Sequence, residues 1–419
     1  MPTPGAGRFI LKNMPYKKSE FETLAKSSLY PQEQLQKVKK GKHSFHIGLP
    51  TEIALQEHRI SLTPDAVALL VNNGHEIYVE TKAGEGSKFS DRAYSEAGAK
   101  IVYSPQEVYK ADVILKIEPP TLEELEYFKP NQILISAMQL GYLGQERLQT
   151  LLKKKITALA YEFIEDKVGG MPIIRAMSEI AGSTVMSIAA EYLSTVKGGR
   201  GIILGGITGV PPTKVVIIGA GTAAEYAARA AFSLGAEIQV FDNHLYKLRR
   251  LKHTLGHQFY TSTIDTVTLS ESLKTADVVI GALRAEKGRA RHVVSEEMVK
   301  NMKPDSLIVD LSIDQGGCIA TSEITSHAKP VFRKYDVIHY CVPNVASRVA
   351  NTATTALSNI FTPTILRAAE EGGIEEMIFS HTWFMKGVYA YKGSLTNESV
   401  ARKFAMKYKN IELLLAARV

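Results

Sequence analysis

Small residues at fixed spacing between positions 219 and 224 are the strongest chemical signal in the sequence. They read G-A-G-T-A-A, directly after the apolar run Val215–Ile218 and at the start of an alanine-rich stretch. Gly219 allows the chain to turn out of a strand, and Gly221 lets the backbone approach a pyrophosphate because it has no Cβ. Ala224 stands where a third glycine is usual, and its small side chain lets a helix pack closely on the strand. The N–H groups at the start of that helix favour phosphate.

An acidic residue stands at the distance that this motif requires. A second apolar run, Ile238–Phe241, ends at Asp242, 21 residues after Gly221. A carboxylate there accepts hydrogen bonds from a ribose 2′-hydroxyl and repels a 2′-phosphate, so NAD is favoured over NADP. The alternative is a glycine-rich turn in an ordinary α/β domain. Because strand, helix and distal acid are all in register, residues 214–242 predict a dinucleotide-binding unit.

Strand-like and helical patterns alternate on both sides of this unit. The strand-like runs before it are Phe45–Leu49, Glu76–Glu80, Lys100–Tyr103, Asp112–Ile117, Gln132–Ala137 and Thr157–Phe163. Those after it are Gln258–Ser262, Asp277–Leu283, Ser306–Ile313 and Val337–Val342. Such alternation predicts parallel sheets covered by helices. We therefore expect an α/β fold with two doubly wound parallel-sheet domains, the second a Rossmann domain inserted into the first.

Composition suggests where these domains begin and end. Residues 1–43 are polar, basic and interrupted by prolines, and we expect an N-terminal extension with one short helix near Glu20–Ser27. The expected substrate domain is 44–180 plus 350–419, and the expected NAD-binding domain is 181–349. Three helices are predicted with some precision, and they are Pro64–Asn73 after a Thr63 cap, Ser178–Thr195 and Val349–Glu371.

Bulk properties exclude several classes of protein. The chain has 419 residues, of which 45% are hydrophobic and 22% charged, as in globular proteins. No apolar run suggests a membrane span, and the N-terminus lacks an export signal. Two cysteines cannot form a disulfide framework or a metal cluster, so we expect a cytoplasmic protein with no metal. The net charge of +7 includes lysine clusters at 37–42 and 153–155, but neither contains the aromatic residues of a nucleic-acid site, and we expect no nucleic-acid partner.

Several further motifs, in chain order, resemble the alanine dehydrogenase and transhydrogenase α-subunit superfamily, most closely the NAD-dependent alanine dehydrogenases. The resemblance covers roughly residues 45–372. Its motifs are G-L-P-T-E-I-A-L-Q-E-H-R-I-S-L-T-P (48–64), A-D-V-I-L-K (111–116), M-S-E-I-A-G (177–182), E-E-M-V-K-N-M-K-P-D-S-L-I-V-D-L-S-I-D-Q-G-G (296–317) and H-Y-C-V-P-N-V (339–345). The resemblance implies oxidative deamination of L-alanine, or a similar small L-amino acid, to pyruvate and ammonium. It also implies NAD as cofactor, a small amino-acid or 2-oxo-acid substrate, and a homo-oligomer, either hexamer or dimer.

The resemblance assigns roles to three polar residues. Arg59 looks like the family's arginine that holds the substrate carboxylate, and a guanidinium offers two parallel donors for that purpose. Lys116 looks like the lysine that contacts the keto or imino oxygen, and Asp314 like the aspartate that transfers protons beside the nicotinamide. Each also has an ordinary interpretation, namely a solvated arginine, a strand-end lysine reaching solvent and a turn aspartate before two glycines.

The cofactor contacts that the motif and the resemblance imply fall in six short segments. These residues are Ser178, Gly219, Gly221, Thr222, Ala223, Asp242, Lys247, Leu283, Leu311, Ile313, Asp314, Val342, Asn344 and Val345.

Two positions depart from the family pattern. Gln139 stands where the family has its presumed acid–base histidine, and Val345 replaces a methionine. Glutamine cannot titrate in the working range, so we expect Gln139 to orient substrate or water while Asp314 carries the proton chemistry. The departure leaves three alternatives open, namely a transhydrogenase α-subunit-like NAD-binding protein, a saccharopine dehydrogenase-like enzyme and a non-catalytic NAD-binding sensor.

Overall fold

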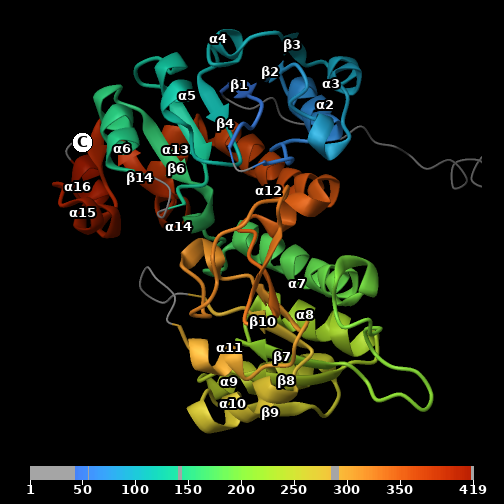
Figure 1. The fold of residues 1–419 in the computed structure, drawn as a ribbon. Helices are drawn as coiled ribbons and strands as arrows, with labels where there is room; N and C mark the ends of the chain where they lie inside the picture. Colours follow the sequence, from blue (N-terminus) through green and yellow to red (C-terminus); the bar gives the residue numbers. More distant parts are fainter. Residues whose placement is uncertain (1–42, 55, 140–143, 285–291, 417–419) are drawn as a thin grey trace, which may run out of the picture. The chain divides into compact units, whose positions relative to one another are not determined.

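The computed structural model describes residues 43–54, 56–139, 144–284 and 292–416 (Figure 1). The expected extension up to residue 42 lies outside the described residues, and so do its short helix near Glu20–Ser27 and its lysine cluster.

The first sheet has eight strands within the described residues, in the order β15-β14-β6-β5-β4-β1-β2-β3. Its strands are β1 His46–Leu49, β2 Glu76–Glu80, β3 Lys100–Val102, β4 Val113–Leu115, β5 Ile133–Ser136, β6 Thr157–Ala160, β14 Val388–Tyr391 and β15 Ser394–Leu395. The six from β6 to β3 are parallel to one another and correspond to the predicted runs, whereas β14 pairs antiparallel with β6. The sheet is therefore mixed rather than purely parallel. The short hairpin β14–β15 was not predicted, because it is defined by its antiparallel pairing with β6 and not by a βα alternation.

The second sheet has the strand order β12-β13-β11-β10-β7-β8-β9. Its strands are β7 Lys214–Ile218, β8 Glu237–Phe241, β9 Tyr260–Ser262, β10 Val278–Gly281, β11 Leu307–Asp310, β12 Val331–Lys334 and β13 Val337–Tyr340. Without β12, this is the doubly wound order of a Rossmann domain, so the expected α/β class is confirmed. The unpredicted edge strand β12 is antiparallel to β13, through a turn in which Tyr335 and Asp336 both have positive φ. That tight turn lacks the glycine by which such hairpins are usually recognised.

Helices flank both sheets (Figure 1). They are α2 Pro64–Asn72, α3 Asp91–Glu96, α4 Pro105–Val108, α5 Leu122–Tyr127, α6 Gln145–Lys153, α7 Pro172–Leu193, α8 Thr222–Ser233, α9 Leu245–Leu255, α10 Thr266–Thr275, α11 Glu296–Lys300, α12 Ala350–Glu371, α13 Ile374–Ser380, α14 Thr382–Met385, α15 Glu398–Phe404 and α16 Ile411–Ala416. Thr63 caps α2 as predicted, because its Oγ1 accepts a hydrogen bond from the Ala66 N–H.

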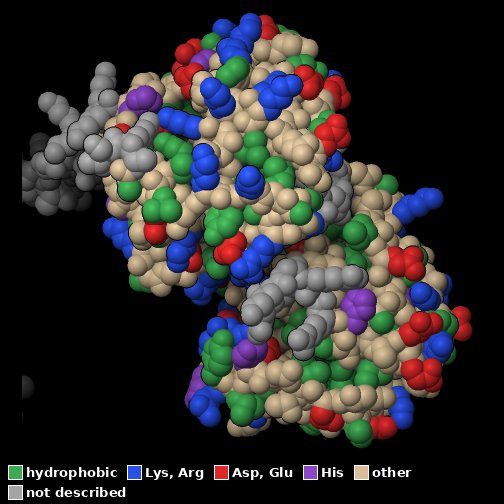
Figure 2. Space-filling view, turned by 90° about the vertical axis from the view of Figure 1, so that its left-hand side faces the viewer, with side chains coloured by type: hydrophobic (Ala, Val, Ile, Leu, Met, Phe, Trp, Pro, Cys, Tyr) green, Lys and Arg blue, Asp and Glu red, His purple; other side chains and the backbone are tan. Residues whose placement is uncertain are grey.

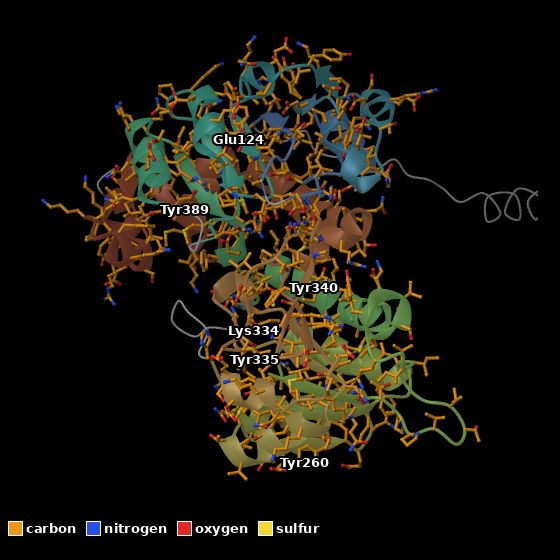
Figure 3. All side chains as sticks on the ribbon, in the orientation of Figure 1. Glu124, Tyr260, Lys334, Tyr335, Tyr340 and Tyr389 are labelled. Atoms are coloured by element: carbon orange, nitrogen blue, oxygen red, sulfur yellow. The ribbon has the colours of Figure 1, made fainter. Side chains whose placement is uncertain are left out.

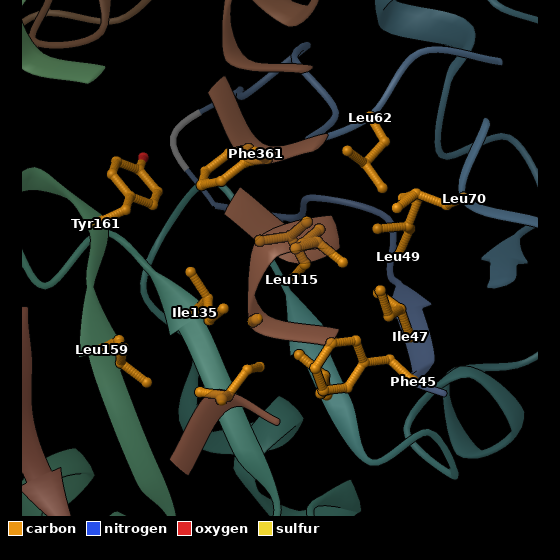
Figure 4. Close-up of a cluster of buried hydrophobic side chains, with 14 of the residues drawn as sticks. Phe45, Ile47, Leu49, Leu62, Leu70, Leu115, Ile135, Leu159, Tyr161 and Phe361 are labelled. Atoms are coloured by element: carbon orange, nitrogen blue, oxygen red, sulfur yellow. The ribbon is translucent and has the colours of Figure 1, made fainter. Parts of the chain in front are cut away.

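Each sheet buries its apolar strand residues under a long helix. In the first sheet, side chains of β1, β4, β5 and β6 pack with Phe361 of α12 (Figure 4). In the second, Ala224, Ala227, Ala228 and Ala231 of α8 are fully buried and pack with residues of α7. Since alanine has no long side chain, α8 can lie close to both the sheet and α7.

Helix α7 combines unusual length with small residues. A Cβ at Gly182 would lie 2.3 Å from the carbonyl oxygen of Ala223, so α7 and α8 touch through their backbones. With 22 residues, α7 is the one helix of the described chain that is long and apolar enough to cross a membrane, which the sequence analysis did not anticipate. Its Val185, Ile188 and Leu193 are buried in the second core, so packing within the protein accounts for its composition.

Charged side chains of both signs are intermixed on the face drawn in Figure 2.

One lysine of the predicted cluster at 153–155 stabilises the end of a helix. The Nζ of Lys154 donates to the carbonyl oxygens of Leu125, Glu126 and Phe128, at 2.7, 2.9 and 3.1 Å, where α5 ends. A cation at these carbonyls compensates the negative end of the helix.

Candidate active site

The turn between β7 and α8 has the geometry that its glycines predict. Gly219 has a φ of +114°, and a Cβ there would lie 2.5 Å from the carbonyl oxygen of Ala282. At Gly221, by contrast, a Cβ would meet nothing within 4 Å, and no side chain caps the start of α8. Open space therefore lies beside a helix N-terminus, as a pyrophosphate requires. The residues present fit a dinucleotide.

Asp242 holds this turn in place. Its buried carboxylate accepts hydrogen bonds from the backbone N–H groups of Ala220, at 2.8 Å, and His244, at 2.7 Å. His244 Nδ1 also lies 3.0 Å from Asp242 Oδ1. Asp242 Oδ2 keeps a second lone pair with which a ribose hydroxyl could bond. Lys247, also expected at the cofactor, is half-buried on α9.

Arg59 is buried rather than solvated. Its Nε and Nη2 donate to the two oxygens of Glu57, at 2.7 and 2.6 Å, and its Nη1 lies 3.3 Å from Met177 Sδ. Burial alone would raise the pKa of Glu57, but the charge and hydrogen bonds of Arg59 lower it to about 2. The pair therefore stays ionised. The guanidinium is held rigidly in the geometry suited to a carboxylate ligand.

A second glutamate connects Arg59 to Gln139. Glu118 Oε1 lies 3.5 Å from Arg59 Nη2, and its Oε2 accepts a hydrogen bond from Gln139 Nε2. Burial and the nearby Glu57 raise the pKa of Glu118 well above its ordinary value, against the opposing effect of Arg59. One arginine thus faces two carboxylates, of which only Glu57 is firmly ionised.

The backbone around Gln139 is fixed by another buried carboxylate. Glu162 Oε1 accepts hydrogen bonds from the N–H groups of Met138, at 2.8 Å, and Gln139, at 3.2 Å. Gln139 has a φ of 41°, which is uncommon for a side chain of this size. Among the described residues, its Oε1 and Glu162 Oε2 are buried without a hydrogen-bond partner. Buried polar atoms normally have partners, so this is where a bound polar ligand or water would fit.

Asn344, which follows β13 of the second sheet, also reaches this cluster. Its Nδ2 donates to Glu57 Oε2 at 3.2 Å, and the N–H of His58 donates to Ser347 Oγ at 2.8 Å. The structure therefore brings the predicted residues Arg59, Gln139 and Asn344 together. Glu57 and Glu118, which join them, were not predicted. The only sequence signal for the two glutamates is that each lies two positions from a predicted cation.

Lys116 belongs to a neighbouring charge cluster, which Glu52 connects to Glu118 by accepting a hydrogen bond from the Glu118 N–H at 3.3 Å. Its Nζ lies 3.1 Å from Glu52 Oε2 and pairs with Glu124, which also accepts a hydrogen bond from the Tyr109 hydroxyl (Figure 3 labels Glu124). Burial alone would lower the pKa of Lys116, but the two glutamates raise it. Only 1% of the lysine is exposed, and no hydrogen bond or ion pair joins it to Arg59 within the described chain. Its predicted contact with the substrate stays a prediction that these surroundings do not favour.

Asp314 lies in a short 3₁₀ turn after β11, and its side chain is exposed to solvent. The protein atoms crowded around it nevertheless raise its pKa to about 6 by desolvation. Asp310 fixes the loop, because its carboxylate accepts hydrogen bonds from the N–H groups of Ser312 and Cys318, both at 3.0 Å. In the part of the chain that the structure describes, no hydrogen bond joins Asp314 to Arg59 or Gln139.

The other predicted cofactor residues follow the carboxyl ends of β10, β11 and β13 or lie on the two helices α7 and α8. Those on the helices, Ser178, Thr222 and Ala223, are half-buried, as are Leu283 and Leu311, whereas Ile313, Val342 and Val345 are buried. Ligands of open α/β sheets bind at these strand ends, so the positions suit a cofactor. No group of three metal-ligating side chains occurs among the described residues.

The chain matches two known protein domains. The alanine dehydrogenase/PNT N-terminal domain matches residues 48–181, and the alanine dehydrogenase/PNT C-terminal domain matches residues 185–398. The chain belongs to the alanine dehydrogenase/PNT family. Within this family, it is 39% identical to the alanine dehydrogenase of Bacillus subtilis (strain 168) over 370 residues, which cover 88% of this chain and 97% of that protein. It is also 39% identical to alanine dehydrogenase 2 of Staphylococcus aureus (strain USA300), with 87% and 98% covered.

Solved structures of alanine dehydrogenase/PNT proteins share this architecture. An L-alanine dehydrogenase superposes with a TM-score of 0.80 at 34% identity and covers 86% of this chain and 99% of its own. A transhydrogenase from Sinorhizobium meliloti superposes with a TM-score of 0.72 at 23% identity, over 84% of this chain and 99% of its own. The second likeness concerns the fold alone.

Proposed function

We propose that the protein is an NAD-dependent alanine dehydrogenase that converts L-alanine, or a similar small L-amino acid, to pyruvate and ammonium. The proposal rests on one observation in this chain, namely that Arg59 is buried and held in place. Arg59 is fixed by Glu57, and Glu57 is also bound by Asn344 from the end of the nucleotide-binding sheet. A carboxylate held at Arg59 is therefore linked through a single glutamate to a predicted cofactor residue.

Each residue has a definite task in this reaction. The remaining donors of Arg59 bind the substrate carboxylate and orient the α-carbon. When bound, NAD supplies the hydride acceptor, and Gly219, Gly221 and the start of α8 hold its pyrophosphate. Asp314, with a pKa of about 6, is ionised at neutral pH and takes a proton from the water that hydrates the imine.

The alternative functions receive less support from the same observations. The resemblance to the transhydrogenase is one of fold, and the relatives with higher identity carry the name alanine dehydrogenase. A sensor would not need an ordered charge network around Arg59. The absence of a histidine at Gln139 is the remaining argument for an unusual substrate.

The test is the formation of NADH, followed by absorbance, with L-alanine, glycine, L-serine, D-alanine and L-lysine plus 2-oxoglutarate. We expect turnover with L-alanine and a preference for NAD over NADP. Turnover only with L-lysine plus 2-oxoglutarate would indicate a saccharopine dehydrogenase-like enzyme. Tight NAD binding without turnover of any substrate would indicate a sensor.

Assembly and location complete the proposal. By resemblance we propose a homo-oligomer, hexamer or dimer, in the cytoplasm. Light scattering coupled to size-exclusion chromatography measures its mass, and a mass near the 46.0 kDa of one chain would contradict the assembly.

A further inference from the structure

The cluster around Arg59 contains one carboxylate more than its cation requires. Glu57 makes two short hydrogen bonds to the guanidinium, whereas Glu118 approaches it only to 3.5 Å. Glu118 is 1% exposed, and its other oxygen is bonded to Gln139 rather than to a cation. A pure structural counter-ion would take the better geometry on the arginine, so a different role accounts better for Glu118.

Two buried acceptor atoms near Gln139 are unsatisfied in the described part of the chain, one on Gln139 itself and one on Glu162, which also binds the Gln139 N–H. Gln139 Oε1 and Glu162 Oε2 are buried and have no hydrogen-bond partner within the described residues. The Gln139 side chain is also hydrogen-bonded to Glu118. An ammonium group would suit the unsatisfied Gln139 Oε1, because it has several N–H donors and no acceptor.

We propose that Glu118 is a catalytic acid–base residue of the deamination reaction and that it takes the proton from the α-ammonium of the substrate. This inference rests on the proposed function. The substrate carboxylate binds Arg59, and its ammonium then lies between Glu118 and the Gln139 side chain. Gln139 orients the ammonium and the Glu118 carboxylate. Glu118 accepts and releases the proton, which glutamine cannot do.

The proton steps balance as follows. An N–H bond of the α-ammonium breaks and an O–H bond forms on Glu118, which leaves a neutral amine. Hydride leaves the α-carbon for NAD, so the carbon is oxidised to the iminium level and NAD is reduced. Water adds to that carbon and loses one proton to Asp314, which passes it to solvent. Protonated Glu118 returns its proton to the nitrogen, the C–N bond breaks, and ammonia takes up the hydroxyl proton as the C=O bond forms.

This acid–base role depends on the charges around Glu118. The titratable groups that act on it are Glu52, Glu57, Arg59 and Tyr161. Its two glutamate neighbours and its burial raise the pKa of Glu118, while Arg59 lowers it. Since Glu118 must be ionised to accept the proton, kcat/KM for L-alanine should fall as pH falls through this raised pKa.

The experiment compares the wild-type protein with Glu118→Gln, which keeps the size and hydrogen bonds of the side chain but cannot titrate. Glu124→Gln serves as the matched control, because Glu124 is also a buried glutamate but pairs with Lys116 rather than with Arg59. The measurements are kcat, the pH profile of kcat/KM, the NADH dissociation constant and the melting temperature. Glu118→Ala with added formate provides a second variant, since formate can supply the missing carboxylate.

We expect Glu118→Gln to lower kcat by roughly 10²–10⁴-fold and to remove one acidic limb of the pH profile, while the NADH dissociation constant is unchanged. Formate should restore turnover of Glu118→Ala in a saturable manner. Glu124→Gln should keep kcat within about threefold, apart from a lower melting temperature.

Three outcomes would overturn the proposal. Glu118→Gln with wild-type turnover and an unchanged pH profile would show that Glu118 takes no part in proton transfer. If that variant does not fold, failure of formate to rescue a folded Glu118→Ala would have the same meaning. A wild-type protein without L-alanine turnover would overturn the proposed function itself, which distinguishes it from the first two results.

Discussion

The glycine turn after β7 and the side-chain cluster around Arg59 are built from different parts of the chain. At the turn, binding groups are backbone N–H groups and open space within residues 219–224. In the cluster around Arg59, the polar groups are side chains from four separate segments, represented by Arg59, Glu118, Gln139 and Asn344. A site made of backbone groups can be predicted from the positions of the small residues. The side-chain cluster depends on how several buried charges share their partners, so it can change between relatives while the fold stays the same.

The largest effect on turnover is expected for Asp314, which belongs neither to the glycine turn nor to the cluster around Arg59. Asp314→Asn should lower kcat by roughly 10²–10⁴-fold, because an amide cannot accept a proton. NADH binding should stay within about threefold, since backbone groups hold the nucleotide. In the wild type, kcat should fall as pH drops through about 6, because Asp314 acts only when ionised and its pKa is raised to that value. Stopped-flow turnover across pH 5–9 checks both; an active variant with an intact limb near pH 6 would exclude Asp314.

Replacing Arg59, the cation of this cluster, should lower both turnover and stability. Arg59→Met should lower kcat/KM for L-alanine by roughly 10³-fold, as two charge-assisted hydrogen bonds to the substrate are lost. It also leaves Glu57 buried without its cation, which should cost about 3–5 kcal/mol of stability in urea unfolding. Arg92→Met is the control, since the Arg92–Glu96 pair is exposed on the surface. Equal effects of the two substitutions would contradict a special role for Arg59.

A pair of glycine substitutions can break the turn in two distinct ways. Gly221→Ala should weaken NAD binding by roughly tenfold or more, because the new methyl group occupies space meant for the pyrophosphate. Its melting temperature should be unchanged, since no protein atom lies within 4 Å. Gly219→Ala should instead destabilise the fold by about 1–3 kcal/mol, because of its positive φ and the nearby Ala282 oxygen. Calorimetry of binding and of unfolding separates them, and a stability loss at Gly221 would refute the open-space interpretation.

The smallest expected effect on turnover concerns Lys116. Lys116→Met leaves Glu52 and Glu124 buried without a cation, so its stability should fall by about 3–5 kcal/mol. The kcat of the folded variant should nevertheless stay within about threefold, because only 1% of the lysine is exposed and its ion-pair partners are Glu52 and Glu124. Turnover normalised to the folded fraction measures this. A loss of 100-fold or more would restore the role that the family resemblance assigns to Lys116.

The fold could be predicted because its signals are local. Six strands in each sheet follow from apolar runs between turn residues, and the caps of α2 and α8 follow from Thr63 and Gly221. The edge strands β12, β14 and β15 escaped prediction, since pairing partners rather than periodicity define them. The spacing between the glycines and the distal acid predicted the turn and Asp242, because backbone geometry there depends on single small residues.

The charge network could not be predicted in the same way. Arg59 and Lys116 both follow buried strands, and nothing in their local sequences shows that one pairs with Glu57 and the other with Glu124. Those partners come from different distances along the chain, two residues in one case and eight in the other. Which cation faces the substrate is decided by tertiary packing, which single-sequence periodicity does not report.

The antiparallel strand β14 has a consequence for synthesis on the ribosome. All strands of the second sheet have been translated once Tyr340 has emerged, whereas β6 of the first sheet waits for Val388–Tyr391 before its outer edge is paired. The sheet that starts first is therefore completed last. Until then, the nascent chain presents an open strand edge to which other chains can add. A ribosome that stalls, or a protease that cuts, between α13 and β14 would release a product with a finished second sheet and an unfinished, aggregation-prone first sheet.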